Sequence, residues 1–272
     1  MSYLKLKNGM KLYFKDVGKG SALIMMHGWT SNSDVYSKPV KNYLQYRARC
    51  ITYDHRGHGK SRDANLEPVN MENIADDLNR LINALSLTDV TLLGWSMGAG
   101  TAMTYIKKYG CSALKQVVLC DMTPKQLNDD DWKLGLYKGR YTKENAEADA
   151  GNNFLTNYRN FSIGAKPVCE KLPVFILDHI LKKRLMYCDE KVLRSLSSSM
   201  KTQDNRDFVE KLDVPLTYFY AVPGSLFSPD LAEWYKDNVK VPFKAVPFQN
   251  STHLLISENP DKFAREVAEL LK

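Results

Sequence analysis

The sequence predicts an α/β protein built on a largely parallel sheet. Short, continuously apolar segments, among them residues 22–26, 90–93 and 117–120, alternate with segments of helical periodicity. Continuous apolar strands separated by helices are typical of a parallel sheet that helices cover on both faces. The 272 residues, 44% hydrophobic and 25% charged, have the composition of a globular protein and are enough for a sizeable core.

The amino-terminal part is expected to begin with antiparallel strands. Apolar and polar residues alternate on both sides of the Asn-Gly turn dipeptide at 8–9, which predicts a β-hairpin. Buried strands follow over 22–26 and 51–53. A helix is predicted over 70–86, because its first residue is an asparagine that can cap it and its apolar residues recur on one face.

The alternation of strands and helices continues with a strand at 90–93, a helix at 99–109 and a strand at 117–120. It stops after Pro124 and resumes at Pro215. The roughly 90 residues between these prolines are too many for one crossover connection. Their helical periodicity predicts a helical insertion.

We therefore expect a core formed by residues 1–123 and 213–272 and a helical cap formed by residues 124–212. The insertion is rich in aromatic residues, which suit either an apolar substrate pocket or the core of the cap itself. The sheet returns with strands at 216–220 and 243–248.

Two helices are predicted in the carboxyl-terminal part. The Ser-Pro pair at 228–229 indicates a helix start, with a hydroxyl N-cap and a proline at the first helical position. The Asn-Pro pair at 259–260 indicates the start of the terminal helix.

Charge and hydropathy do not favour nucleic acid or a membrane span. The net charge is +7, and the densest basic runs, 107–108 and 182–184, fall in amphipathic helical segments that predict solvated faces. No apolar run reaches the roughly 18 residues of a membrane-spanning helix. No feature indicates an oligomeric state.

The expected location is the cytoplasm. The amino terminus lacks the apolar segment and cleavage site of a signal peptide, and the five cysteines form no CxxC pair. Neither a metal-binding HxH or HExxH motif nor a GxxxxGK[ST] phosphate loop occurs, so we expect no metal and no cofactor.

The most specific motif is the Gly-x-Ser-x-Gly segment at 94–98, which joins a strand to a helix. This arrangement makes a tight turn that exposes the serine at a helix N-terminus, where backbone N–H groups and the helix dipole favour developing negative charge. Ser96 is therefore the predicted nucleophile. The alternative is a serine that only caps the helix.

A serine hydroxyl is a weak nucleophile and needs a base. His253 lies between the last strand and the last helix, from where it can reach back across the strand ends to Ser96. We expect the remaining histidines to satisfy hydrogen bonds in loops and in the core; they are His27, His55, His58 and His179.

These segments resemble the α/β-hydrolase superfamily over nearly the whole chain. Residues 27–29 resemble its oxyanion loop, 54–61 the loop after the next core strand, 94–98 its nucleophile elbow and 252–260 its histidine loop, although Thr252 stands in place of the usual glycine. The resemblance implies the α/β-hydrolase fold, a mostly parallel eight-stranded sheet with an amino-terminal antiparallel hairpin and a helical cap.

The resemblance also implies roles for two backbone groups. The N–H groups of Trp29 and Met97 occupy the positions that form the family's oxyanion hole. Epoxide hydrolases and haloalkane dehalogenases have an aspartate nucleophile, whereas this chain has Ser96.

The triad acid departs from the family's common pattern. Most relatives place an aspartate in the loop after the strand at 216–220, but here Ser225 occupies that position. Asp121 directly follows the strand beside the nucleophile strand, and some esterases of the superfamily use an aspartate there. Asp230 is an alternative, although the helix dipole alone explains a carboxylate in a first helical turn. The third possibility is a site without a strong acid. We favour Asp121.

The leading hypothesis is a serine hydrolase that cleaves a carboxylic ester or thioester of a small acyl substrate. Ser96 would attack the carbonyl, His253 would take its proton and Asp121 would orient the imidazole. The alternatives are a cofactor-free haloperoxidase or perhydrolase, a C–C hydrolase or lyase on the same triad, and a small-molecule receptor with low turnover.

Overall fold

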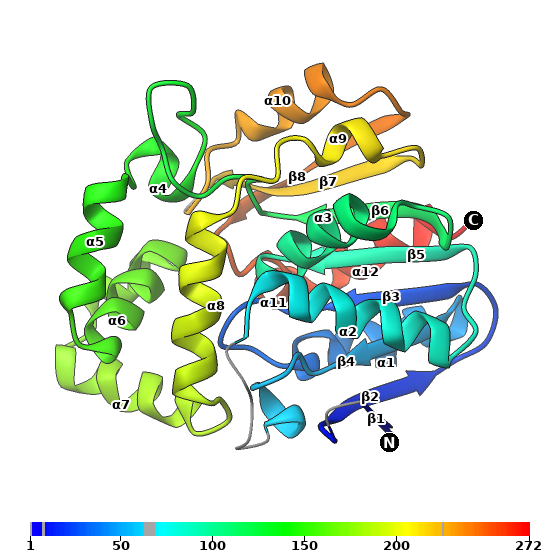
Figure 1. Cartoon of the computed structure of the whole chain (residues 1–272), viewed down its shortest axis with the longest axis horizontal. Helices are drawn as coiled ribbons and strands as arrows, with labels where there is room; N and C mark the ends of the chain where they lie inside the picture. The colour runs from blue at the N-terminus through cyan, green and yellow to red at the C-terminus, as the bar shows by residue number, and fades with distance from the viewer. Residues whose placement is uncertain (1, 7–8, 63–68, 225) are drawn as a thin grey trace.

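The computed structural model describes residues 2–6, 9–62, 69–224 and 226–272. Its centre is an eight-stranded sheet in the order β1-β2-β4-β3-β5-β6-β7-β8 (Figure 1). β2 is antiparallel to β1 and to β4, and the strands from β4 to β8 are parallel to one another. The bounds are β1 (Ser2–Lys5), β2 (Lys11–Val17), β3 (Ala22–Met26), β4 (Arg49–Tyr53), β5 (Val90–Trp95), β6 (Leu114–Cys120), β7 (Leu216–Pro223) and β8 (Phe243–Ser251).

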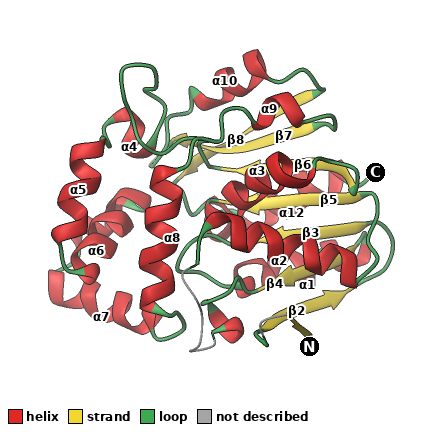
Figure 2. Cartoon of the chain, in the orientation of Figure 1, coloured by secondary structure: helices red, strands yellow, loops and turns green. Residues whose placement is uncertain are grey.

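Helices cover both faces of the sheet (Figure 2). One apolar cluster joins the sheet to α2 (Met71–Ala84), α3 (Met97–Tyr109) and α10 (Leu231–Asn238), and a second joins the opposite face to α1 (Ser37–Asn42), α11 (Leu255–Glu258) and α12 (Pro260–Leu270). Continuously buried strands such as β3 are the result.

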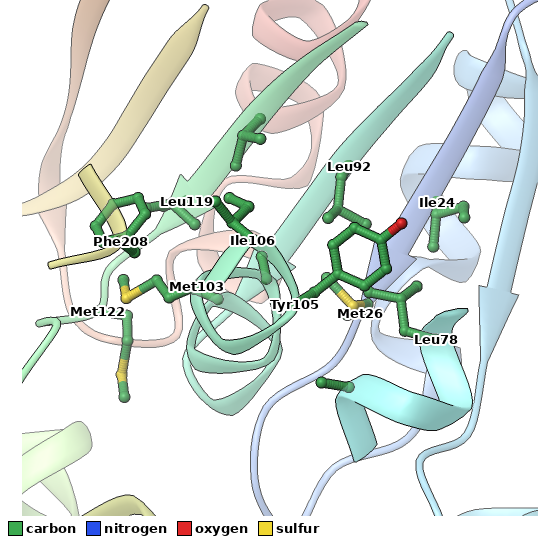
Figure 3. Packing of buried hydrophobic residues seen from close by; sticks show 14 of the residues in the cluster. Ile24, Met26, Leu78, Leu92, Met103, Tyr105, Ile106, Leu119, Met122 and Phe208 are labelled. Atoms are coloured by element: carbon green, nitrogen blue, oxygen red, sulfur yellow. The ribbon is translucent and has the colours of Figure 1, made fainter. Parts of the chain in front are cut away.

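Helix α3 is held firmly against the middle of the sheet. Its Met103 and Ile106 lie in one cluster with Leu92 of β5 and Leu119 of β6 (Figure 3). Complete burial of each such side chain contributes about 1.5–3 kcal/mol. This packing fixes the turn between β5 and α3.

The chain between β6 and β7 forms the helices α4 (Leu136–Gly139), α5 (Lys143–Gly151), α6 (Phe154–Ala165), α7 (Val174–Leu185), α8 (Glu190–Thr202) and α9 (Phe208–Lys211). Helices α5 to α8 lie together beyond one end of the sheet (Figure 1). Helix α8 is tied to the start of α2 and the residues before it, because Ser195 Oγ donates to Val69 O at 2.6 Å and Met71 N donates to Ser199 Oγ at 3.0 Å.

The predicted fold class is confirmed, and most elements occur where the sequence predicts them. The strand at 22–26 coincides with β3, and the Asn70 side chain accepts from Asn73 N at the start of α2. The terminal helix begins at Pro260 as predicted. Strands β1 and β2 form the predicted hairpin, whereas Asn8 lies outside the described residues.

Three helix ends differ from the prediction. Helix α3 begins at Met97 rather than 99, because Ser96 takes the N-cap position. Helix α2 ends at Ala84 because Ser86 adopts a left-handed conformation with φ of 49°. Helix α10 begins at Leu231, not at the Ser-Pro pair at 228–229, because these residues form a turn in front of the helix.

Among the described residues, no helix combines the length and the apolar character needed to cross a membrane.

Candidate active site

Ser96 lies in the turn between β5 and α3, with φ of 54° and ψ of −121°. Its N–H donates to Cys120 O of the neighbouring strand at 3.0 Å. The flanking residues have to be glycine, because a Cβ on Gly94 would lie 2.2 Å from Gly98 O, and one on Gly98 would lie 2.2 Å from Met26 O. The turn therefore presents the Ser96 hydroxyl at the carboxyl end of the sheet.

His253 follows β8 and lies beside Ser96. Its Nε2 is 2.9 Å from Ser96 Oγ, and its backbone carbonyl accepts from Trp95 Nε1 at 2.8 Å. The residue before it closes the loop, because Thr252 donates to the Glu258 carboxylate from its N–H at 2.8 Å and from its Oγ1 at 3.0 Å. The threonine that replaces the family's usual glycine thus supplies a hydrogen bond to the loop.

The carboxylate that meets His253 belongs to Asp121. Its Oδ2 is 2.7 Å from His253 Nδ1, and its Oδ1 accepts from Ala221 N at 3.2 Å. The Asp121 N–H donates to Phe219 O at 2.7 Å, which ties the residue to β7. Ser96, His253 and Asp121 are all buried, and they form one chain of hydrogen bonds (8%, 2% and 2% exposed).

The alternative acids do not reach this chain in the described part of the structure. Asp230 is exposed at the start of α10, where its Oδ2 accepts from Ser228 Oγ at 2.8 Å. Ser225 lies outside the described residues. Among the described residues, Asp121 is thus the candidate acid that contacts His253.

The two expected oxyanion donors, the N–H groups of Met97 and Trp29, belong to backbone segments close to Ser96. Met97 is the first residue of α3, where backbone N–H groups have no acceptor within the helix. Trp29 follows Gly28, and a Cβ on Gly28 would lie 3.1 Å from Ser96 Cβ, so the Trp29 backbone is close to the serine. The Trp29 indole donates to Leu193 O of α8 at 3.0 Å.

Three buried histidines support the loop that carries Trp29. His27 accepts from His55 N at Nε2 (3.0 Å), and its Nδ1 is 2.8 Å from Gly28 O. His58 accepts from Thr30 N at Nε2 (3.3 Å). A ring nitrogen that accepts from a backbone N–H is unprotonated, so this arrangement requires neutral rings at His27 and His58.

Burial lowers the pKa of His27 and lowers the pKa of His58 to about 3, with the neighbouring His27 adding to the shift at His58. It also lowers the pKa of His55 well below its usual range.

The expectation that the other histidines satisfy hydrogen bonds holds for His27 and His58. At His55 the backbone N–H donates to His27, whereas neither ring nitrogen makes a hydrogen bond of ordinary geometry in the described structure. His179 is exposed on α7.

A cavity of about 540 Å³ opens onto Ser96 and His253. Its other walls come from α6, the 3₁₀ helix η4 (Pro167–Lys171) and α7, and include Phe161, Leu177 and Leu181. The insertion's aromatic residues serve both predicted uses. Tyr158 and Phe161 line the cavity and also pack with Phe154 in the apolar cluster of the inserted helices.

No group of three or more His, Cys, Asp or Glu side chains that could hold a metal ion occurs in the part of the chain that the structure describes. The five cysteines, four of them buried, are free thiols.

A family model described as the alpha/beta hydrolase fold matches residues 21–213. The chain belongs to the α/β-hydrolase fold family. The match begins before β3 and ends before β7, so it includes the nucleophile turn and the helical insertion. This is a family of enzymes, and the relatives of this α/β hydrolase include esterases and non-heme haloperoxidases.

Two curated relatives show this range. The non-heme chloroperoxidase CPO-A1 of Kitasatospora aureofaciens is 34% identical over 125 residues, which are 46% of this chain and 45% of that protein. The bifunctional esterase/perhydrolase DCH of Acinetobacter calcoaceticus is 28% identical over 126 residues, with the same two shares. The α/β hydrolase thus spans somewhat less than half the length of these relatives.

Among solved structures, the esterase EaEST from Exiguobacterium antarcticum superposes with a TM-score of 0.84. The likeness covers 99% of this chain and 98% of that one at 24% identity. It shows that the two proteins share the fold over their full compared length.

Proposed function

We propose that this α/β hydrolase cleaves a carboxylic ester or thioester through an acyl-enzyme on Ser96. One observation carries the proposal: the unbroken chain of hydrogen bonds from Ser96 Oγ through His253 to Asp121 at the floor of a cavity with largely apolar walls. This combination of nucleophile, base and acid is the arrangement that acyl transfer requires.

The proposed reaction follows from these contacts. Ser96 Oγ attacks the ester carbonyl while its proton passes to His253 Nε2. Asp121 accepts from His253 Nδ1, which keeps the other nitrogen free as a base and stabilises the imidazolium. His253 then gives the proton to the leaving alcohol or thiol, and the same histidine activates the water that releases the acid.

The oxyanion would be stabilised by the N–H groups of Met97 and Trp29. Each such donor contributes roughly 3–4 kcal/mol to stabilisation of the transition state. Because these donors are backbone groups, the two side chains are free to serve other purposes. The Trp29 indole, for example, packs edge-on against Tyr158 and Phe161 of the cavity wall.

We further propose that residues 124–212 act as a cap on a core of residues 1–123 and 213–272. Support comes from the cavity, whose floor consists of core residues and whose walls come from α6 and α7. On this proposal the cap selects the acyl or alcohol group, and the core performs the reaction.

The test is the Ser96→Ala variant, assayed with p-nitrophenyl esters and acyl-CoA thioesters of graded chain length. We expect kcat to fall by about 10⁴–10⁶, because the members of a triad act as a unit. Wild-type protein, but not the variant, should react with a fluorophosphonate probe. A variant that keeps a tenth of the activity would contradict the assignment, and single turnover of every ester by the wild type would favour a receptor.

Perhydrolysis is a second candidate, favoured by the names of the chloroperoxidase and perhydrolase relatives. In that reaction hydrogen peroxide replaces water, so that the acyl-enzyme releases a peracid. Comparing peracid formation with ester hydrolysis at equal acyl-donor concentration would decide between the two, and Ser96→Ala should abolish both.

A further inference from the structure

One segment of the cap, residues 166–187, carries an unusual share of exposed apolar side chains. Of twelve large hydrophobic residues that are exposed in the described structure, eight lie between 168 and 187. They are Val168, Leu172, Val174, Phe175, Ile176, Ile180, Met186 and Tyr187. Scattered single residues of this kind need no explanation, but eight of them within one short segment favour an interaction site. The exposed side chains of residues 166–187, apolar and charged, together form the 166–187 surface.

The same surface is basic. Lys171, Lys182, Lys183 and Arg184 are exposed, and no ion pair engages them within the described residues. The pairs that the segment does form use Lys166, with Glu258 at 3.3 Å, and Asp178, with Arg159 at 2.6 Å. Glu170 is the remaining exposed acid of the segment. The surface is thus complementary to negative charge.

The geometry of α7 explains how one helix serves two sides. Leu177 and Leu181 are buried and line the active-site cavity. At 100° per residue, Phe175, Lys182 and Lys183 lie on the opposite, outward arc. Helix α7 lies along the lower edge of the inserted helices in Figure 1.

The surface is also continuous with the mouth of the cavity. Val168, Leu172, Ile180 and Tyr187 belong both to the exposed apolar group and to the cavity lining. Whatever binds the surface therefore lies next to the path by which a substrate reaches Ser96.

The mixture of residues decides between two kinds of occupant. The cores of protein–protein interfaces are depleted in lysine. At a lipid surface, by contrast, apolar side chains insert among the acyl chains while flanking lysines reach the anionic head groups. We propose that the 166–187 surface docks the protein on an anionic lipid surface, with the mouth of the active-site cavity towards the lipid.

The charge component is tested by co-sedimentation of the full chain with vesicles of phosphatidylcholine alone or mixed in equal parts with phosphatidylglycerol. We expect binding to the mixed vesicles that weakens as salt is added. The double variant Lys182→Glu/Lys183→Glu should reduce the partition coefficient by about tenfold or more. The matched control Lys19→Glu/Lys240→Glu changes the net charge equally on exposed residues outside the surface and should change binding by less than about twofold.

The apolar contribution to binding is tested by a variant and a control at equally exposed aromatic residues. Phe175 and Tyr46 are both 75% exposed, and Tyr46 lies outside the surface. Phe175→Ser should weaken binding several-fold, whereas Tyr46→Ser should leave it unchanged. Neither change removes a buried contact, and circular dichroism checks that all variants keep the fold.

Three results would overturn the proposal. The first is equal sedimentation of the wild type with both kinds of vesicle, and the second is an equal loss of binding in the control variants. The third is a dimer, detected by light scattering, that Phe175→Ser dissociates while vesicles leave the protein in solution. That last result would identify a second copy of the chain as the occupant.

Discussion

Ser96 and Asp121 both have a positive φ, 54° and 45°, in a region that L-residues rarely adopt. Each follows a strand of the parallel sheet directly, so the chain turns sharply and points the side chain across the strand ends. Such a conformation is less stable by about 1–3 kcal/mol. Backbone hydrogen bonds to Cys120 O and Phe219 O hold the two residues in place.

This strain leads to a prediction about stability. The free energy of unfolding of Ser96→Gly should be higher than that of Ser96→Ala by roughly 1 kcal/mol, because glycine adopts a positive φ without a Cβ clash. Urea unfolding of the two variants, both expected to lack the nucleophile, measures the difference. Equal stabilities would show that the turn holds no strain.

The geometry at His253 leads to a prediction about activity. Asp121→Asn keeps the shape of the side chain but can offer an amide N–H to Nδ1, so kcat should fall by about 10³–10⁴. Asp230→Asn is the control, and it should lose only the helix-terminus effect of roughly 0.3–1 kcal/mol in stability. Nearly normal turnover by the Asp121 variant would refute its proposed role.

At the scale of elements, the loops after β3 and β4 depend on each other. The His27 ring accepts a hydrogen bond from the His55 N–H, and the His58 ring accepts one from the Thr30 N–H. These two bonds fix the segment that carries Trp29. Their pKa values are lowered in the folded protein. Below the usual histidine pKa the unfolded chain therefore binds more protons than the folded protein, and stability falls as the pH falls.

The loss of stability is expected as the pH falls below the usual histidine pKa of 6.5, and at His58 it continues down to the folded-state pKa of about 3. Between about pH 7.5 and 5.5, each of the three buried histidines should remove up to about 1.4 kcal/mol from the free energy of unfolding. Urea unfolding at the two pH values measures this, and His58→Gln should flatten the dependence. His179→Gln, at an exposed position, should leave it as it is. A wild type with equal stability at both pH values would contradict the prediction.

Sequence pattern predicts these elements unevenly. The strands and Ser96 are predictable, because continuous apolar runs and the steric demands of the turn are local properties. The contact of Asp121 with His253 is predictable from its place directly after a core strand together with the resemblance to esterases that carry an aspartate there. The support of the Trp29 loop by His27 and His58 is not, because it depends on contacts 28 residues apart in the chain. Which of the insertion's aromatic residues line the cavity is likewise a tertiary property.

At the scale of the whole molecule, the active-site cavity lies where the helical insertion meets the sheet. The floor is fixed by the strand ends, and the walls come from α6, η4 and α7. A change in these walls should therefore alter which substrates fit while the hydrogen-bonded chain at Ser96 stays intact.

Cys169→Trp tests this separation, because Cys169 is half-buried in η4 and lines the cavity. We expect kcat/KM for a long-chain p-nitrophenyl ester to fall by about tenfold or more, since pocket contacts discriminate at about 1–3 kcal/mol per methylene. The acetyl ester should be affected by less than about twofold. Val174→Trp, an exposed cap position outside the lining, is the control. An equal effect on both esters would place the selecting contacts elsewhere.

The position of the Asp121 carboxylate directly after β6 has a consequence for how this protein can diversify. Among the described residues, β7 gives the Asp121 carboxylate a backbone donor, Ala221 N, and the segment after β7 supplies no carboxylate to His253. In that segment, the Phe227 ring lies 5.6 Å from the imidazole of His253. Substitutions at Phe227, which is buried in the main apolar cluster, can therefore reshape the surroundings of the base without replacing its carboxylate partner, at a cost in stability. This makes the segment a natural first target for directed evolution of new substrate preferences.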